Sequence, residues 1–147
     1  HPSDRLSVGD EIFTVVSSVQ EAEERIFVSM RELLGTWEEN AAGFEVGQTV
    51  SGIIRSVESY GIFVELQPNL AGLAEYKENV YPEQTAAVYI KSLIPERMKV
   101  KLILIDTHSA SAEIAPARYF VDCERTQHID TWQYSPSASA RIIRTVF

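Results

Sequence analysis

The sequence predicts a mostly β protein built around a small closed β-barrel between residues 44 and 106. Two observations support this fold class. Five short runs rich in Val, Ile and Phe follow one another in this region, and turns containing Gly or Pro separate them. Within the runs, apolar and polar residues alternate, which is the pattern of a strand with one buried face. A hydrophobic share of 45% is enough to fill a core.

An antiparallel hairpin is expected before the barrel. The run GDEIFTVVSSV at 9–19 and the run RIFVSM at 25–30 both have strand composition, and the polar EAEE joins them. The spacing then changes to that of a helix over 31–44, with Gly35 inside it, so we expect a short, broken linker helix. Its apolar positions are Leu33, Leu34, Trp37 and Ala41.

The barrel region divides into five expected strands. Pro68-Asn69 marks a turn after the second strand, and Pro95-Glu96-Arg97 joins the last two strands into a hairpin. A polar loop fills 77–84. The strands are expected near 49–57, 60–66, 70–76, 85–94 and 98–106.

The first hairpin resembles the last one. In both, a long apolar strand and a polar turn precede a strand that opens with a basic residue, Arg25 or Lys99. This indicates an internal repeat with a spacing of about 75 residues. The N-terminal copy contains only the last two strands of such a module.

The tail at 107–147 is less regular. Strands are expected at 117–123 and 128–134, with Trp132 and Tyr134 on one face holding the tail against the barrel. Ser135-Pro136 is a typical helix start, and apolar pairs four residues apart predict a final helix. These pairs are Ile142 with Val146 and Ile143 with Phe147.

The segment at 46–76 carries a motif of glycines and aromatics in a fixed order. It resembles the S1 RNA-binding domain family, whose fold is a five-stranded OB-fold barrel. The resemblance implies an S1 domain at 44–106. It also implies the end of a preceding S1 module plus a linker at 1–43, and an extension packing on the barrel at 107–147. The matching residues are Val46-Gly47, Gly52, Tyr60-Gly61-Ile62-Phe63-Val64 and Gly72-Leu73.

The resemblance also implies an RNA-binding face. The family uses two aromatics, a His, an Asp and a basic residue. The aromatic positions fall on Tyr60 and Phe63, and the basic position falls on Lys99. The His position holds Glu75, and the Asp position falls near Pro95, so this chain departs from the family at both.

Strand alternation supports the aromatic pair independently. Ile62, Val64 and Leu66 share one parity and should line the barrel, so Phe63 points outward. Tyr60 lies beside Gly61, where a kink can turn it to the same face. Exposed rings of this kind stack on nucleic-acid bases. The alternative is that one ring packs beneath the linker helix or the tail.

Charged residues extend the candidate site. Lys99 and Lys101 alternate with apolar residues and should face solvent together, and Arg55 and Lys91 could lengthen the basic strip. The alternative is an ordinary solvated strand face. Glu75 either marks a lost site, because carboxylates repel phosphates, or accepts a hydrogen bond from a cytosine amino group.

Composition excludes several other functions. The net charge of −8 argues against broad phosphate binding, although nine of the acidic residues lie within 1–43. No apolar run is long enough for a membrane helix, and a single cysteine cannot form an intrachain disulfide. His108, His128 and Cys123 lack zinc-site spacing. No nucleophile elbow or phosphate loop is present, so we expect no catalytic residue, metal or cofactor, and no enzyme activity. The start at His1 suggests a fragment.

The leading functional hypothesis is single-stranded RNA binding with low sequence specificity. The protein would act in the cytoplasm near translation or RNA turnover, with the ribosome or RNA-processing proteins as further partners. One alternative is a protein-interaction module that kept the barrel and lost its RNA site, as the acidic charge, Glu75 and the tail suggest. Another is an RNA-holding appendage of a larger enzyme.

Overall fold

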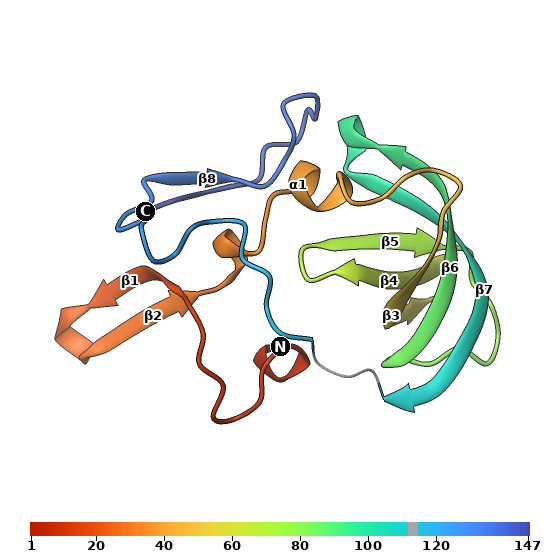
Figure 1. Ribbon diagram of the computed structural model, residues 1–147, viewed down its shortest axis with the longest axis horizontal. Coiled ribbons are helices and arrows are strands. Elements are labelled where there is room, and N and C mark those ends of the chain that lie inside the picture. Colours follow the sequence, from red (N-terminus) through yellow and green to blue (C-terminus); the bar gives the residue numbers. More distant parts are fainter. Residues whose placement is uncertain (112–114) are drawn as a thin grey trace.

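The computed structural model describes residues 1–111 and 115–147 (Figure 1). Within these ranges the chain forms nine β-strands, one α-helix and four short 3-10 helices. The predicted mostly β fold class is confirmed. No helix in the described part of the chain is both long and apolar enough to cross a membrane.

Five strands form a closed barrel, at the right of Figure 1. The strand order around it is β3-β4-β5-β7-β6, and every pairing is antiparallel except β5 with β7, which is parallel. The predicted five-stranded barrel is therefore confirmed. Its strands are β3 (Thr49–Glu58), β4 (Gly61–Gln67), β5 (Leu70–Ala74), β6 (Gln84–Ile94) and β7 (Lys99–Ser111).

Alternate residues of each strand fill the barrel interior. Ile62 and Val64 on β4 are fully buried, whereas Phe63 between them is only half-buried and lies on the outer surface. Each fully buried aliphatic side chain contributes about 1.5–3 kcal/mol through removal of apolar area from water. Because the inward-facing residues of β4 are enclosed in the core, only its outward-facing residues, such as Phe63, reach the surface.

Two glycines let β5 approach its neighbours closely. A Cβ atom at Gly61 would lie 2.7 Å from both the Ala74 carbonyl oxygen and Leu73 Cδ1. A Cβ atom at Gly72 would lie 2.5 Å from Leu102 Cδ1 on β7. The glycine beside the two aromatics is thus required by strand packing, because any side chain there would push β5 away.

The predicted linker helix is short and broken, as expected. It consists of η3 (Arg31–Leu33) and α1 (Trp37–Ala41), and Gly35 separates them with a φ of +96°. Thr36 caps α1, because its hydroxyl accepts from the Glu39 amide at 3.1 Å while its own amide donates to the Glu39 carboxylate at 3.0 Å. Trp37 is buried and packs into the barrel core.

Asn69, in the turn between β4 and β5, fixes the linker and the tail to the barrel. Its side-chain amide donates to the carbonyl oxygens of Arg31 and Gly35, both at 2.8 Å. Its backbone carbonyl accepts from the Tyr134 hydroxyl at 2.6 Å. Burial raises the pKa of Tyr134 above its usual value.

The N-terminal hairpin is shorter than expected. It pairs β1 (Val15–Gln20) with β2 (Arg25–Ser29) through η2 (Glu21–Glu23), and η1 (Pro2–Asp4) precedes it. The expected strand at 9–19 begins only at Val15. Residues 9–14 pair with no described strand. Although their composition favours a strand, they therefore form none.

The tail contains a second hairpin instead of a helix. β8 (Thr131–Gln133) pairs antiparallel with β9 (Arg144–Val146), so the expected C-terminal helix is wrong. The Ser135 hydroxyl accepts from the Ile143 amide at 2.9 Å, which closes the loop between the strands rather than starting a helix. The expected strand at 117–123 is also wrong, since that segment has no strand partner. Its Phe120 amide instead donates to the Leu33 carbonyl at 2.9 Å.

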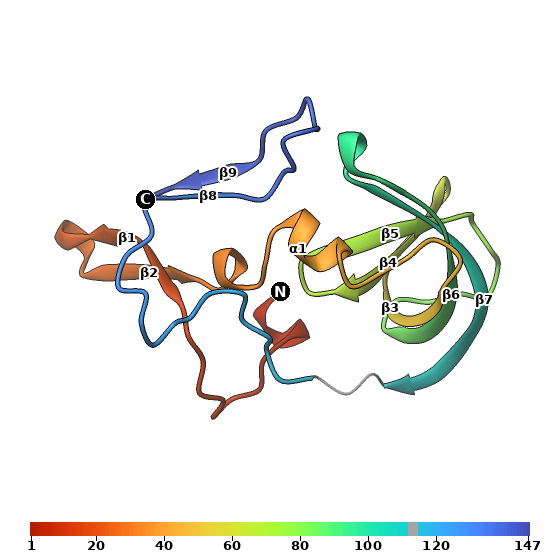
Figure 2. The same cartoon turned by 45° about the horizontal axis from the view of Figure 1, so that its top comes forward.

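The two hairpins outside the barrel lie on the far side of the linker. Figure 2 shows β1–β2 and β8–β9 to the left of α1, with the barrel to its right. Trp132 on β8 is buried, with its ring centroid 5.9 Å from that of Tyr134 and 5.5 Å from the Arg31 guanidinium carbon. The tail thus packs on the linker through Trp132 and against the barrel core through Tyr134.

Candidate nucleic-acid interface

An open groove of about 910 Å³ runs along the outer surface of β4, β5 and β7. Six of the seven residues predicted for RNA binding line it, although they come from separate strands and loops. These residues are Tyr60, Phe63, Glu75, Lys91, Lys99 and Lys101.

The two predicted aromatics form a pair at one side of this groove. Tyr60 lies in the turn before β4 and is 68% exposed, and its ring meets that of Phe63 at 82° with the centroids 6.1 Å apart. Phe63 lies directly opposite Leu73 on β5, and Leu73 lies opposite Lys101 on β7. Phe63, Leu73 and Lys101 therefore form one row across three neighbouring strands, which connects the aromatic pair to the lysines.

The tail leaves the groove accessible. No residue from the described part of 107–147 is among those that line it. The alternative in which the tail packs over the rings is therefore not what the structure shows. The exposed Tyr60 and the half-buried Phe63 each bring an aromatic ring to the groove beside polar groups, and base stacking requires such rings.

The basic side of the groove carries free positive charge. Lys91, Lys99 and Lys101 are exposed, and a fourth lysine, Lys77, also lines the groove. Within the described residues, none of these lysines forms an ion pair. Glu75 is the one acidic residue of the lining. The groove is therefore locally positive on a protein whose net charge is −8.

Glu75 is exposed and directly follows the end of β5, close to the lysines. A carboxylate there weakens the positive potential that a phosphate would meet. It can also accept hydrogen bonds from an exocyclic amino group of a base.

Arg55 lies outside the groove. Its Nη2 atom is 2.8 Å from Glu65 Oε2, and the Arg5 Nη2 atom is 2.7 Å from Glu65 Oε1. Glu65 thus bridges two arginines in a separate cavity that also contains the N-terminal segment. The structure assigns Arg55 to that ion-pair cluster, where the Glu65 carboxylate holds its guanidinium away from the groove.

Several lining residues were not expected from the sequence. Tyr76 and Lys77 follow Glu75 in the loop after β5, and Met98 lies in the turn before β7. Strand alternation could have found Ile103, which has the same parity as Lys99 and Lys101. Loop residues such as Tyr76 carry no comparable periodic signal.

The described part of the chain contains no group of three or more His, Cys, Asp or Glu side chains arranged to hold a metal ion. Burial raises the pKa of the single cysteine, Cys123, which lies in the tail.

The closed mixed barrel with an open groove on its outer wall defines an OB-fold protein. No protein-family model matches the chain. It is 28% identical over 120 residues to small ribosomal subunit protein bS1 of Rhizobium meliloti, covering 73% of this chain and 21% of that protein. It is 27% identical over 143 residues to a bS1 homolog of Bacillus cereus, covering 95% of this chain and 36% of that protein. The chain carries an S1-like domain.

A further relative is named as an enzyme. A 4-hydroxy-3-methylbut-2-enyl diphosphate reductase of Fusobacterium nucleatum is 33% identical over 107 residues, which cover 72% of this chain and 13% of that protein. The chain therefore spans only a small share of each of these relatives.

Proposed function

We propose that the protein binds single-stranded RNA in the groove formed by β4, β5 and β7. One observation carries the proposal: the exposed ring of Tyr60 and the half-buried ring of Phe63 lie in the same groove as lysines that form no ion pair with any described residue. Rings and free cations together are the two components of single-strand binding. The bS1 names of several relatives are in keeping with an RNA-associated role.

The ring geometry suggests how bases would be held. Because the Tyr60 and Phe63 planes are nearly perpendicular, one flat base cannot stack on both. Each ring would instead take its own base, and Tyr76 offers a third ring at the same groove. Stacking contributes about 1–3 kcal/mol per base and reads little sequence. Low sequence selectivity follows.

The lysines would hold the RNA backbone. Lys91, Lys99 and Lys101 line the groove on the β6–β7 side, and Lys77 lies in the loop after β5. Each phosphate neutralised on a single strand lowers the slope of log K against log salt by about 0.7. One module should therefore bind weakly and with marked salt sensitivity, and it would gain affinity by acting together with other modules.

The relatives suggest a cellular setting. Since proteins named as small ribosomal subunit protein bS1 match most of this chain, we propose that it acts in the cytoplasm with the ribosome or RNA-processing proteins, as a binding protein rather than a catalyst.

Fluorescence anisotropy with labelled oligo-uridine at low salt tests the proposal. Tyr60→Ala and Phe63→Ala should each weaken binding about fivefold to a hundredfold, since each removes one stacking surface. Tyr81→Ala is the matched control, because Tyr81 is an exposed tyrosine outside the groove. Equal effects of all three changes would contradict RNA binding at this groove.

A protein-interaction role is the second candidate, and Glu75 together with the net charge of −8 favours it. In that case the groove would accept a peptide or protein surface rather than RNA. The same titration separates the two roles, because a pure interaction module would show no binding of oligo-uridine at high micromolar protein.

A further inference from the structure

The hairpin β1–β2 presents aliphatic side chains to solvent on one of its faces. Val19 on β1 pairs with Ile26 on β2, next to the turn that joins the strands, and Val16 pairs with Val28 farther from the turn. Val19 is 58% exposed and Ile26 is 67% exposed, although side chains of this kind are usually buried. Adjacent exposed aliphatic residues are typical of an interaction surface.

Acidic residues lie next to this exposed pair. The turn between the two strands carries three glutamates, and Arg25 is the only cation within 15–29. Arg25 pairs with Glu23 at 3.4 Å, whereas Glu21 and Glu24 form no ion pair with any described residue. The exposed pair and the turn together are called the hairpin tip, which consists of Val19, Glu21, Glu23, Glu24 and Ile26.

The groove of β4, β5 and β7 is complementary to the hairpin tip in charge and polarity. Its four lysines form no ion pair with a described residue, and Glu75 is the one acidic residue of its lining. Two aliphatic side chains lie beside Lys101: Leu73, opposite it on β5, is 37% exposed, and Ile103, along β7, is 48% exposed. The groove therefore places cations next to an apolar surface, as the hairpin tip places carboxylates next to one.

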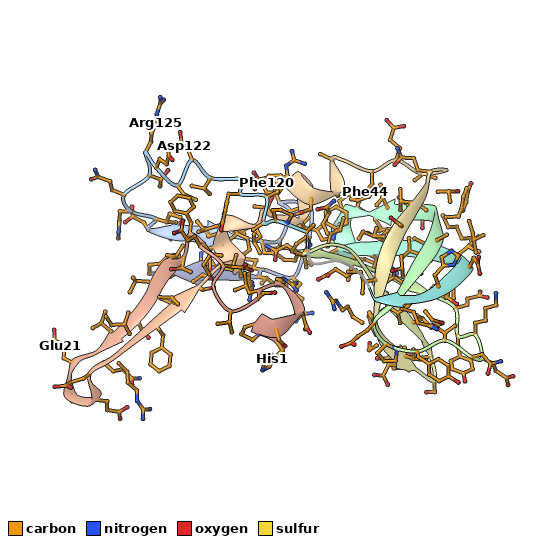
Figure 3. All side chains as sticks on the ribbon, turned by 60° about the horizontal axis from the view of Figure 1, so that its bottom comes forward. His1, Glu21, Phe44, Phe120, Asp122 and Arg125 are labelled. Atoms are coloured by element: carbon orange, nitrogen blue, oxygen red, sulfur yellow. The ribbon has the colours of Figure 1, made fainter. Side chains whose placement is uncertain are left out.

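The anchor of the hairpin keeps its tip away from the groove of its own chain. At the end of β2 the Ser29 hydroxyl donates to Glu32 Oε2 at 2.5 Å, and the Thr145 hydroxyl of β9 donates to Glu32 Oε1 at 3.0 Å. Glu32 is itself buried, so these contacts are shielded from water. Figure 3 shows Glu21, in the turn of the hairpin, at the opposite end of the molecule from the barrel. A partner for the hairpin tip must therefore come from another molecule.

We propose that the hairpin tip of one copy of the protein docks in the lysine groove of a second copy. Glu21 and Glu24 then lie against the lysines, and the pair of Val19 and Ile26 covers Leu73. Such a contact joins two different surfaces, so the copies either close into a reciprocal dimer or add to one another in a chain.

Docking would regulate access to the groove, and this consequence rests on the proposed function. Carboxylates and phosphates would be bound by the same lysines, so the hairpin tip and RNA compete for one site. Assembly at high protein concentration would withhold the groove from RNA, and RNA would separate the copies. Because exposed charges contribute to both contacts, added salt should weaken both.

An exchange of charges between the two surfaces tests the contact. The hairpin variant carries Glu21→Lys and Glu24→Lys, and the groove variant carries Lys99→Glu and Lys101→Glu, each in the full 147-residue chain. Sedimentation velocity at low salt, over a range of protein concentrations, measures the association of each variant alone and of their equimolar mixture.

The parent chain should self-associate, and each variant alone should do so at least about tenfold more weakly, because like charges then face each other. The mixture should regain most of the lost affinity, because the lysines of one variant meet the glutamates of the other. All four replaced side chains are exposed, so the core remains intact, and urea unfolding verifies this for each variant.

Matched controls separate the contact from a general effect of charge or of exposed apolar area. Glu11→Lys with Glu124→Lys reverses two exposed carboxylates outside the hairpin tip and the groove, and should associate like the parent chain. Ile26→Ser should weaken association, whereas Ile142→Ser should not, although Ile142 in the tail is 65% exposed.

Addition of oligo-uridine to the assembled parent chain tests the competition. The RNA should dissociate the assembly as it fills the groove. If the charge exchange behaves as expected but oligo-uridine does not bind, the docking contact is supported and the proposed function is contradicted.

Four results would overturn the docking contact. One is a parent chain that binds oligo-uridine but stays monomeric at high micromolar concentration. Another is a groove variant that associates as strongly as the parent chain, which would indicate a contact between two hairpins. The third is a mixture that associates no better than either variant alone. The last is an assembly that binds oligo-uridine without dissociating, which would place the contact outside the groove.

Discussion

The rings of Tyr60 and Phe63 meet edge to face, with their centroids 6.1 Å apart, at the side of a groove that the tail leaves open. Ring pairs of this geometry usually help to fill a core. Here Tyr60 is largely exposed, and cross-strand pairing leads from Phe63 through Leu73 to Lys101. A ligand that contacts the ring pair would therefore also lie within the groove that the lysines line.

The lysines should govern the salt dependence of RNA binding. Lys99→Gln or Lys101→Gln should each make the slope of log K against log salt less negative by about 0.7, because one phosphate contact is lost. Arg97→Gln is the control, since Arg97 is an exposed cation outside the groove lining. Oligo-uridine titrations between low and moderate salt measure the slopes. If Arg97→Gln changed the slope as much as Lys99→Gln does, the RNA would be attracted by the overall positive charge and not by contacts in the groove.

Removal of the Glu75 charge should strengthen binding of oligo-uridine. Glu75→Gln removes a carboxylate next to the lysines, and the gain should be about two- to fivefold for a partly screened charge near phosphates. Glu78→Gln is the control, because Glu78 is exposed and not part of the lining. Titrations with oligo-uridine and oligo-cytidine measure both effects. A loss of oligo-cytidine affinity in Glu75→Gln would instead identify the carboxylate as a hydrogen-bond acceptor.

Gly61 should tolerate no side chain. In Gly61→Ala the new Cβ atom would lie 2.7 Å from the Ala74 carbonyl oxygen, so β5 must shift, at a cost of about 1–3 kcal/mol in the free energy of unfolding. Gly43→Ala is the control, because its Cβ would meet its nearest atom at an ordinary 3.6 Å. Urea unfolding measures both variants. Equal stability of the two would contradict the close approach of β5 to Gly61.

Tyr134 should make the protein sensitive to alkali. Its hydroxyl donates to the Asn69 carbonyl at 2.6 Å, and burial raises its pKa. The unfolded chain then loses its phenolic proton at lower pH than the folded chain, so stability falls as the pH rises through 10.0, the usual value of the group. Tyr134→Phe should cost about 1 kcal/mol near neutral pH. The variant should also lose less stability than the parent above that pH in urea unfolding, and an identical pH profile of the two proteins would refute the role of Tyr134.

The barrel could be predicted from sequence because its signals are local and periodic. Alternation along β4 assigned Ile62 and Val64 to the interior and Phe63 to the outside, and the buried and exposed sides agree with it. The glycines at 61 and 72 were part of the motif, and strand packing now explains them. The basic positions on β7 followed from the same alternation.

The tail could not be predicted by the same route, because its structure depends on distant partners. Ser135-Pro136 has the composition of a helix start, but the Ser135 hydroxyl bonds the Ile143 amide across a hairpin. The position of Arg55 outside the groove depends on a distant partner as well. Strand alternation predicts which side of β3 Arg55 lies on. Its ion pair with Glu65 could not be predicted in this way, because it depends on how β3 and β4 align in the folded sheet.

Chemical-shift mapping with isotope-labelled protein and unlabelled oligo-uridine would locate RNA on the surface. If the groove is the binding site, the changes should gather at Tyr60, Phe63 and Lys99 and spare Arg55 and the β8–β9 hairpin. Absence of any change at high micromolar RNA, or changes confined to surfaces away from the groove, would contradict RNA binding by this barrel.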